Sequence, residues 1–235
     1  MQSSLRIGAL DEQGRGRVAG TVVTCEGLAS IAGMSRNQIS CDLVEIRYDH
    51  LGGCEQWEQN CRRLAAQGVP LLFTVRSNKE GGKWDAGDQA RLPVYKKALE
   101  FAAAVDVEFQ SYVVDEVAGF ASAANRTLLL SYHNFAATPP LEELLEIYKA
   151  AAKIGGIVKI STMVNGEEDI RTLEALLQYR TEVPLCVIGM GPKATHTRIS
   201  FAQKGSCLTY GYLDEPGAPG QLSAAELCRG LAAKA

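Results

Sequence analysis

The sequence lacks three features that would point to particular partners or locations. It has no basic excess, because 24 Lys and Arg residues stand against 27 Asp and Glu. Proteins that bind nucleic acid need a basic surface, so no nucleic-acid partner is predicted. There is no run of about 20 apolar residues, the length of a membrane-spanning helix, and no membrane partner is predicted. Residues 1–6 do not resemble the apolar stretch of a signal peptide, so we expect a cytoplasmic protein.

Histidine is scarce, and the cysteines are not paired in sequence. There are three His and seven Cys, and no two Cys form a CxxC pair. Zinc sites are built from clustered Cys and His ligands, so no metal site is predicted. Phosphate-binding loops of the GxGxxG and GxxxxGK[ST] types are absent, as are HExxH and GxSxG. These absences argue against nucleotide-binding, zinc-protease and α/β-hydrolase functions.

Size and composition predict one globular domain. The chain has 235 residues, of which 46% are hydrophobic and 22% are charged. Those values exclude a disordered chain and supply a core that needs no disulfide or metal. No linker, low-complexity stretch or break in composition interrupts the chain, so residues 1–235 are predicted to form a single domain.

Short apolar runs rich in β-branched residues recur along the whole chain. They span residues 18–25, 41–47, 70–75, 105–108, 127–132, 156–160, 184–188 and 207–210. Near-continuous hydrophobicity indicates strands buried on both faces, and amphipathic segments such as 140–148 alternate with them. About eight such units predict a (β/α)8 TIM barrel, with a doubly wound sheet as the alternative. Polar residues gather at the C-terminal ends of the runs, where barrel active sites lie, and this favours the barrel.

Lys159 is the most unusual residue because it lies inside an apolar run, 157–160, with the sequence IVKI. Burial of an ammonium group is costly and favours the uncharged, nucleophilic amine. A desolvated lysine is the usual group for Schiff-base chemistry on a ketone. The alternative is a lysine at a strand end whose amine reaches solvent.

His133 directly follows the fifth run, which precedes the run that carries Lys159. Consecutive strands of a barrel are neighbours, so the two side chains should lie close together. Imidazole can take and return a proton near neutral pH, which makes His133 a candidate acid–base group. A purely structural histidine at a strand end is the alternative, and His50 and His196 are weaker candidates in expected loops or helix surfaces.

Charged residues at other strand ends could bind a polar substrate. Glu45 and Arg47 share one face of their strand, where they form either an ion pair or a polar wall that grips hydroxyl groups. Arg76 follows the third run and can donate to an oxyanion, and Glu80 can orient an acid–base histidine. Arg198 follows the seventh run and is a candidate for a substrate carboxylate. A generic Arg and Glu on a loop is the alternative for Arg76 and Glu80, and an ordinary helix-surface arginine is the alternative for Arg198.

A glycine- and proline-rich segment, residues 214–220, follows the last apolar run. Its composition is incompatible with a helix and predicts a mobile loop over the barrel mouth.

Five stretches, in order along the chain, resemble the type I 3-dehydroquinate dehydratases of the shikimate pathway. They are residues 45–49 (EIRYD), 73–76 (FTVR) with 80–82 (EGG), 131–135 (SYHNF), 158–160 (VKI) and 218–221 (APGQ). The ordered set covers nearly the whole chain. The resemblance implies a (β/α)8 barrel, usually a homodimer, that uses no metal and no organic cofactor.

The resemblance also implies a hydro-lyase reaction, the syn-elimination of water from 3-dehydroquinate to give 3-dehydroshikimate. Lys159 would form an imine with the substrate ketone, and the protonated imine would acidify the neighbouring C–H bond. His133 would remove that proton and then protonate the departing hydroxyl, while Glu80 would position His133. The substrate would be bound by Glu45, Arg47, Arg76, Arg198 and Gln221.

The chain departs from the family pattern at two positions. Ile46 stands where Trp is usual, and strand alternation turns it outward, so only a packing change is expected. Gly217 stands where a Ser often precedes the loop Gln, which predicts weaker contacts from the closing loop.

Two alternative functions follow from the same residues. An aldolase-type Schiff-base enzyme should bind phosphate near residues 189–191, whereas Arg198 suits a carboxylate. A non-catalytic binding barrel would keep the pocket without turnover.

Overall fold

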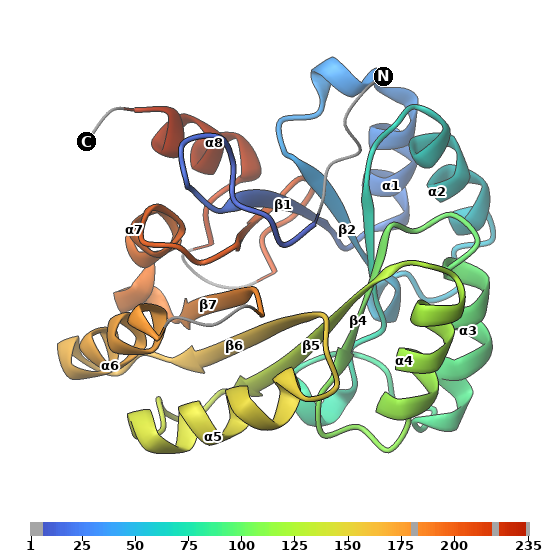
Figure 1. Cartoon of the computed structure of the whole chain (residues 1–235). Helices are drawn as coiled ribbons and strands as arrows, with labels where there is room; N and C mark the ends of the chain where they lie inside the picture. The colour runs from blue at the N-terminus through green and yellow to red at the C-terminus, as the bar shows by residue number, and fades with distance from the viewer. Residues whose placement is uncertain (1–6, 180–182, 218–220, 234–235) are drawn as a thin grey trace.

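The computed structural model describes residues 7–179, 183–217 and 221–233, in which eight strands and eight α-helices alternate (Figure 1). The strands are β1 (Arg17–Val22), β2 (Leu43–Arg47), β3 (Leu71–Thr74), β4 (Ala104–Glu108), β5 (Thr127–Asn134), β6 (Ile157–Met163), β7 (Leu185–Met190) and β8 (Leu208–Tyr212). The helices are α1 (Cys25–Gly33), α2 (Trp57–Ala66), α3 (Leu92–Ala98), α4 (Val114–Ala123), α5 (Leu141–Ala152), α6 (Glu167–Gln178), α7 (Thr197–Gln203) and α8 (Ala224–Ala232).

The strands close into a barrel with helices around it, as Figure 1 shows. All paired strands are parallel, in the order β7-β6-β5-β4-β3-β2-β1-β8. The two ends of this order meet, because the Cys207 N–H donates to the Leu185 carbonyl at 2.9 Å. The (β/α)8 prediction is therefore confirmed, and the doubly wound alternative is wrong.

Strand alternation divides the apolar residues into an inner and an outer core. The outer core lies between strands and helices and contains Val44, Ile46 and Phe73, all fully buried. Ile46 therefore points outward as expected. A smaller inner core fills the barrel near the N-terminal ends of the strands, with Leu43, Leu72, Ala104, Leu129, Ile157 and Cys186.

Polar side chains replace the inner core one layer further along the strands. Two residues after Leu43, Leu129 and Ile157, the inward positions are Glu45, Ser131 and Lys159. Because all strands are parallel, these polar positions meet at one end of the barrel. The site is therefore placed at the C-terminal ends of the strands.

Several strand boundaries differ from the sequence-based ranges. The run 18–25 ends as a strand at Val22, and Cys25 begins α1 because the side chain of Thr24 caps that helix. β5 continues to Asn134, so His133 lies within the strand rather than after it. Among the described residues, no helix has the length and hydropathy needed to cross a lipid bilayer.

Candidate active site

A cavity of about 170 Å³ opens at the C-terminal ends of the strands. All eight site residues proposed from the sequence line it: Glu45, Arg47, Arg76, Glu80, His133, Lys159, Arg198 and Gln221. The lining also includes Tyr210 and Gly217, whereas His50 and His196 lie outside it. Residues that are far apart in sequence therefore share one concave site.

The amine of Lys159 is buried beside a carboxylate and an aromatic ring. The residue is only 7% exposed, so the alternative of a lysine that reaches solvent is wrong. Its Nζ lies 3.4 Å from Oδ2 of Asp106 and 4.3 Å from the ring centroid of Tyr210. A carboxylate and a ring face both attract a cation placed beside them. The surroundings suit a cationic iminium formed on Lys159.

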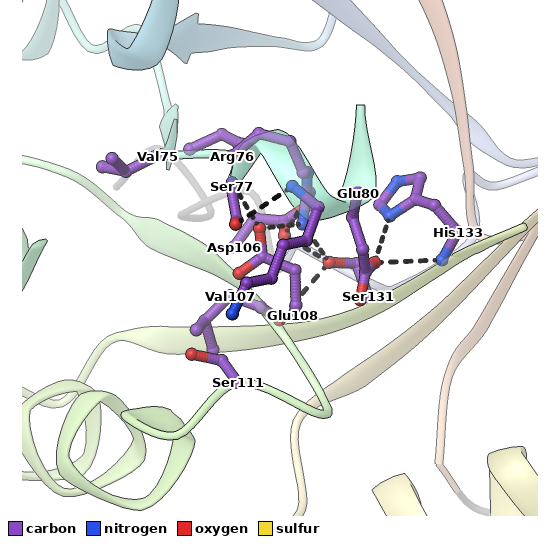
Figure 2. A network of polar contacts seen from close by, with 12 residues as sticks. Val75, Arg76, Ser77, Glu80, Asp106, Val107, Glu108, Ser111, Ser131 and His133 are labelled. Atoms are coloured by element: carbon purple, nitrogen blue, oxygen red, sulfur yellow. Dashed lines mark hydrogen bonds and ion pairs between the residues drawn. The ribbon is translucent and has the colours of Figure 1, made fainter. Parts of the chain in front are cut away.

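His133 and Glu80 form a close pair, shown in Figure 2. Nδ1 of His133 lies 2.9 Å from Oε2 of Glu80, and the backbone N–H of His133 donates to the same oxygen at 3.1 Å. Burial and the nearby cations Arg76 and Lys159 hold the pKa of His133 well below its usual value. The imidazole is therefore neutral at neutral pH. When Nδ1–H donates to Glu80, Nε2 is the nitrogen that can accept a proton.

The carboxyl group of Glu80 has an unusual proton affinity. Burial raises the pKa of Glu80 to about 7, with the positive charge of Arg76 acting against it and Glu108 and Asp106 adding to it. A carboxyl group that changes protonation near neutral pH can either accept or release the imidazole Nδ1 proton. The pair can therefore change its hydrogen bonding within the physiological pH range.

Glu45 and Arg47 share the inner face of β2 but have different partners, so the ion-pair alternative does not describe them. The hydroxyls of Thr21 and Thr74 each donate to Glu45 at 2.9 Å. Arg47 donates to both carboxylate oxygens of Asp49, at 3.0 and 2.8 Å. Each side chain is held in place by a neighbour and still lines the cavity.

Arg198 lies on α7, close to the end of β7. Within the described part of the chain it forms no ion pair, and burial lowers the pKa of its guanidinium to about 10. A half-buried cation that lines a cavity without a carboxylate partner is a ready site for an anion. The alternative of an ordinary helix-surface arginine does not fit this position.

The loop after β8 is tied down at its start. The carboxylate of Asp214 accepts hydrogen bonds from the backbone N–H of Val23, at 3.0 Å, and of Thr24, at 2.8 Å. Further along, the N–H of Gly217 donates to Oε1 of Gln221 at 2.7 Å. The other members of the APGQ stretch, residues 218–220, lie outside the described residues.

The family assignment follows from a match over most of the chain. The family model described as type I 3-dehydroquinase matches residues 21–234. The chain belongs to the type I 3-dehydroquinase family.

Curated relatives from this family resemble the chain over most of its length. The 3-dehydroquinate dehydratase of Methanocella arvoryzae is 34% identical over 194 residues, which cover 82% of this chain and 87% of that protein. The 3-dehydroquinate dehydratase of Methanocaldococcus jannaschii is 37% identical over 186 residues, covering 77% and 82%.

Solved structures share the fold. The type I 3-dehydroquinate dehydratase of Clostridium difficile superposes with a TM-score of 0.85 at 24% identity, covering 99% of this chain and 96% of that one. The 3-dehydroquinate dehydratase of Aquifex aeolicus gives a TM-score of 0.75 at 26% identity, covering 91% and 96%.

A buried polar network lies next to Lys159 and was not predicted from the sequence (Figure 2). Arg76 donates to Asp106 and to the hydroxyl of Ser131, both at 2.6 Å, and forms an ion pair with Glu108 at 3.1 Å. The sequence contained a signal for this network, because Asp106 and Glu108 are acidic residues two positions apart in an apolar run. The same spacing had singled out Glu45 and Arg47.

Proposed function

We propose that this chain is a lyase, a 3-dehydroquinate dehydratase that eliminates water through a Schiff base on Lys159. The observation that carries the proposal is the buried amine of Lys159 in one cavity with the Glu80–His133 pair and the unpaired cation Arg198. Membership of the type I 3-dehydroquinase family supports the same substrate and the same place in the shikimate pathway.

The first step joins the substrate to the enzyme. The uncharged amine of Lys159 adds to the ketone carbon of 3-dehydroquinate, and the adduct takes up one proton and loses one water to give a protonated imine. The carboxylate of Asp106, 3.4 Å from Nζ, stabilises the positive charge on that nitrogen. The iminium withdraws electrons from the neighbouring C–H bond and so acidifies it.

The second step is the elimination. Nε2 of neutral His133 takes the acidified proton, and the C–H electron pair moves into the iminium to form an enamine. The protonated imidazole then gives its proton to the hydroxyl on the adjacent carbon, which leaves as water while the iminium re-forms. Hydrolysis of that iminium consumes one water and releases 3-dehydroshikimate, the free amine and the proton taken up in the first step, so the net change is the loss of one water.

Glu80 makes His133 suitable for both roles. Its Oε2 holds the ring through Nδ1 and the main chain through the backbone N–H. An ionised Glu80 stabilises the imidazolium that forms between the two proton transfers. The low pKa of His133 keeps the ring uncharged before the reaction, as a base must be.

The substrate's carboxylate would pair with Arg198, which is half-buried and forms no ion pair with the described residues. Hydroxyl groups of the substrate would be bound by Glu45, Arg47, Arg76 and Gln221, which line the same cavity. Arg76 donates two hydrogen bonds to protein partners and forms an ion pair with Glu108, and a guanidinium carries five N–H donors, so donors remain for a ligand.

We also propose that the enzyme works in the cytoplasm and as a homodimer. The seven cysteines are free thiols, which suits a reducing compartment, and a homodimer follows from the resemblance to the family. Light scattering on the purified protein tests the dimer, and a monomeric mass at micromolar concentration would contradict it.

Borohydride trapping tests the function. Wild-type protein is incubated with 3-dehydroquinate, reduced with sodium borohydride, digested and mapped by mass spectrometry. Ligand mass should appear on the peptide that contains Lys159 and be absent from Lys159→Ala. The matched control Lys153→Ala, which alters an exposed lysine, should label and turn over like wild type.

Two results would overturn the proposal. One is labelling at another lysine, or none at all, in wild-type protein. The other is turnover of a sugar phosphate instead of 3-dehydroquinate in a panel of both substrate classes, which would favour the aldolase-type alternative.

A further inference from the structure

A row of buried charges of alternating sign leads away from the amine of Lys159. Nζ of Lys159 lies 3.4 Å from Asp106, and Asp106 lies 2.6 Å from Nη2 of Arg76. Nη1 of Arg76 lies 3.1 Å from Glu108, and the other carboxylate oxygen of Glu108 lies 2.5 Å from Nη1 of Arg91. Figure 2 shows the middle of this row, with Arg76 between Asp106 and Glu108.

All four groups beyond Lys159 are removed from solvent. Asp106 and Arg91 are fully buried, and Arg76 and Glu108 are each 3% exposed. A buried charge without a partner is strongly destabilising, so each group depends on its neighbours in the row. Removing one charge therefore leaves the next group in the row without part of its compensating charge.

Glu108 and Asp106 compete for the same cation. Both carboxylates contact the guanidinium of Arg76, and each has a second cation: Lys159 for Asp106 and Arg91 for Glu108. Glu108 also accepts the backbone N–H of Ser77 at 2.8 Å, at the start of the segment that leads to Glu80. With Arg91 in place, Glu108 is neutralised and Arg76 stays on Asp106.

Arg91 itself is held firmly and does not line the cavity. It is the last residue of a short 3-10 helix, Gln89–Arg91, and donates to the carbonyl of Val75 at 2.9 Å and to Ser111 at 2.7 Å. Its second ion pair, at 2.6 Å, is with Asp88. Arg91 therefore joins the segments that follow β3 and β4 while its guanidinium faces Glu108.

We propose that Arg91 is a positioning residue for the elimination, acting through Glu108 and Arg76 to hold the Asp106 carboxylate beside the Lys159 nitrogen. The inference rests on the proposed function, because it assigns a role in the Schiff-base chemistry of that site. Arg91 contacts neither substrate nor reacting atoms. It supplies the charge that leaves Arg76 available to Asp106.

Loss of Arg91 should change the charge felt by the acid–base pair. Glu80 is faced by His133, by the cation Arg76 and by the anions Asp106 and Glu108. An uncompensated Glu108 would draw Arg76 away from Asp106 and leave extra negative charge near the cavity. Extra negative charge favours the protonated form of Glu80, so the pH at which activity appears should rise.

The test compares Arg91→Gln, Glu108→Gln and the double variant, with Asp88→Asn as the matched control. Asp88 pairs with Arg91 on the side away from Glu108. Measurements are kcat and KM for 3-dehydroquinate, and the pH dependence of kcat/KM. Arg91→Gln should lower kcat about 10-fold or more with little change in KM, and should move the acidic limb upward on the order of 0.5 pH unit. Asp88→Asn should leave the limb in place.

The direction in which the acidic limb of the kcat/KM profile moves distinguishes a positioning role from a merely structural one. Glu108→Gln removes a negative charge and should move the acidic limb downward, opposite to Arg91→Gln. If Arg91 acts only through Glu108, the double variant should match Glu108→Gln in its pH profile. If Arg91→Gln does not fold, Glu108→Gln and the double variant, which removes the Glu108 carboxylate together with its partner Arg91, still test the inference.

Each outcome has one meaning. Wild-type protein that does not turn over 3-dehydroquinate, or is labelled away from Lys159, overturns the proposed function and this inference with it. Wild-type turnover combined with an unmoved pH profile in folded Arg91→Gln overturns the inference alone. A double variant whose profile differs from that of Glu108→Gln also overturns it, because Arg91 would then act by another route.

Discussion

A single oxygen, Oε2 of Glu80, lies 2.9 Å from Nδ1 and 3.1 Å from the backbone nitrogen of His133, although the two residues belong to different parts of the barrel. Glu80 ends a short 3-10 turn, Asn78–Glu80, and His133 lies near the end of β5. Gly81 follows with φ of 76°, and the ring of Phe135 packs where a Cβ of Gly81 would stand. The turn that presents Glu80 therefore requires glycine at this position.

Removal of the imidazole should stop proton transfer without preventing imine formation. His133→Ala is expected to lose on the order of 10²–10⁴ in kcat, the usual contribution of a positioned acid–base group. Borohydride should still trap ligand on Lys159 in this variant. His196→Ala, which alters an exposed histidine outside the cavity, is the control. A His133→Ala enzyme with near-normal kcat would show that another group moves the proton.

The pH profile should report Glu80. Because its pKa is raised to about 7, the carboxylate is present above that pH and is lost as the pH falls through it. The pKa of His133 lies well below its usual value, so the imidazole remains neutral over this range. Activity should therefore decline on the acidic side near pH 7. Glu80→Gln has no group to ionise there, so its kcat should be lower and free of that limb; persistence of the limb would assign it elsewhere.

Arg198 should affect substrate binding more than turnover. A charge-assisted hydrogen bond is worth about 1.5–3 kcal/mol, so Arg198→Ala should raise KM about 10–100-fold. Arg198→Lys should recover part of that loss, because lysine keeps the positive charge but cannot bind a carboxylate through two parallel N–H groups. Arg171→Ala, at an exposed position on α6, serves as the control. Steady-state kinetics decide, and an unchanged KM in Arg198→Ala would leave the carboxylate without this partner.

Substitutions of Gly217 and Gln221, two residues of the loop after β8 that line the cavity, should change KM. Gly217 does not have a left-handed φ, and a Cβ there would lie 3.4 Å from Oε1 of Gln221, an ordinary contact. Gly217→Ser should therefore be accommodated and lower KM several-fold at most, the worth of one net hydrogen bond of about 0.5–1.5 kcal/mol. Gln221→Ala should raise KM, because its amide N–H groups are lost to the ligand. If KM of Gln221→Ala equals that of wild type, this loop does not cover the substrate.

Asp214 should hold the start of the same loop in place for substrate binding. Its carboxylate accepts hydrogen bonds from Val23 and from both the backbone and the hydroxyl of Thr24. Asp214→Ala frees these donors and loosens the loop, so KM should rise while imine trapping at saturating substrate is retained. Glu215→Ala, at the exposed neighbouring position, should behave as wild type. Equal KM values for the two variants would mean that the hydrogen bonds of Asp214 do not contribute to substrate binding.

Local patterns in the sequence were sufficient to predict the architecture and to single out residues that line one cavity. Parallel barrel strands are buried on both faces, so each of the eight strands appears as a short apolar run, and the expected ranges overlap all eight observed strands. Lys159 was found because a charge inside such a run conflicts with its surroundings. His133 and Glu80 were found from their places next to strand ends and from a family resemblance.

Tertiary structure alone decided which side chains became partners. Glu45 shares a strand face with Arg47. It nevertheless accepts hydrogen bonds from the hydroxyls of Thr21 and Thr74, because the neighbouring strands β1 and β3 bring those hydroxyls within reach. The row from Asp106 to Arg91 likewise joins segments whose distance in space is set by strand register and barrel closure, not by their spacing in sequence. A residue's type and local pattern determine whether it will be inward and polar. Only the packed barrel determines which opposite charge or donor it meets.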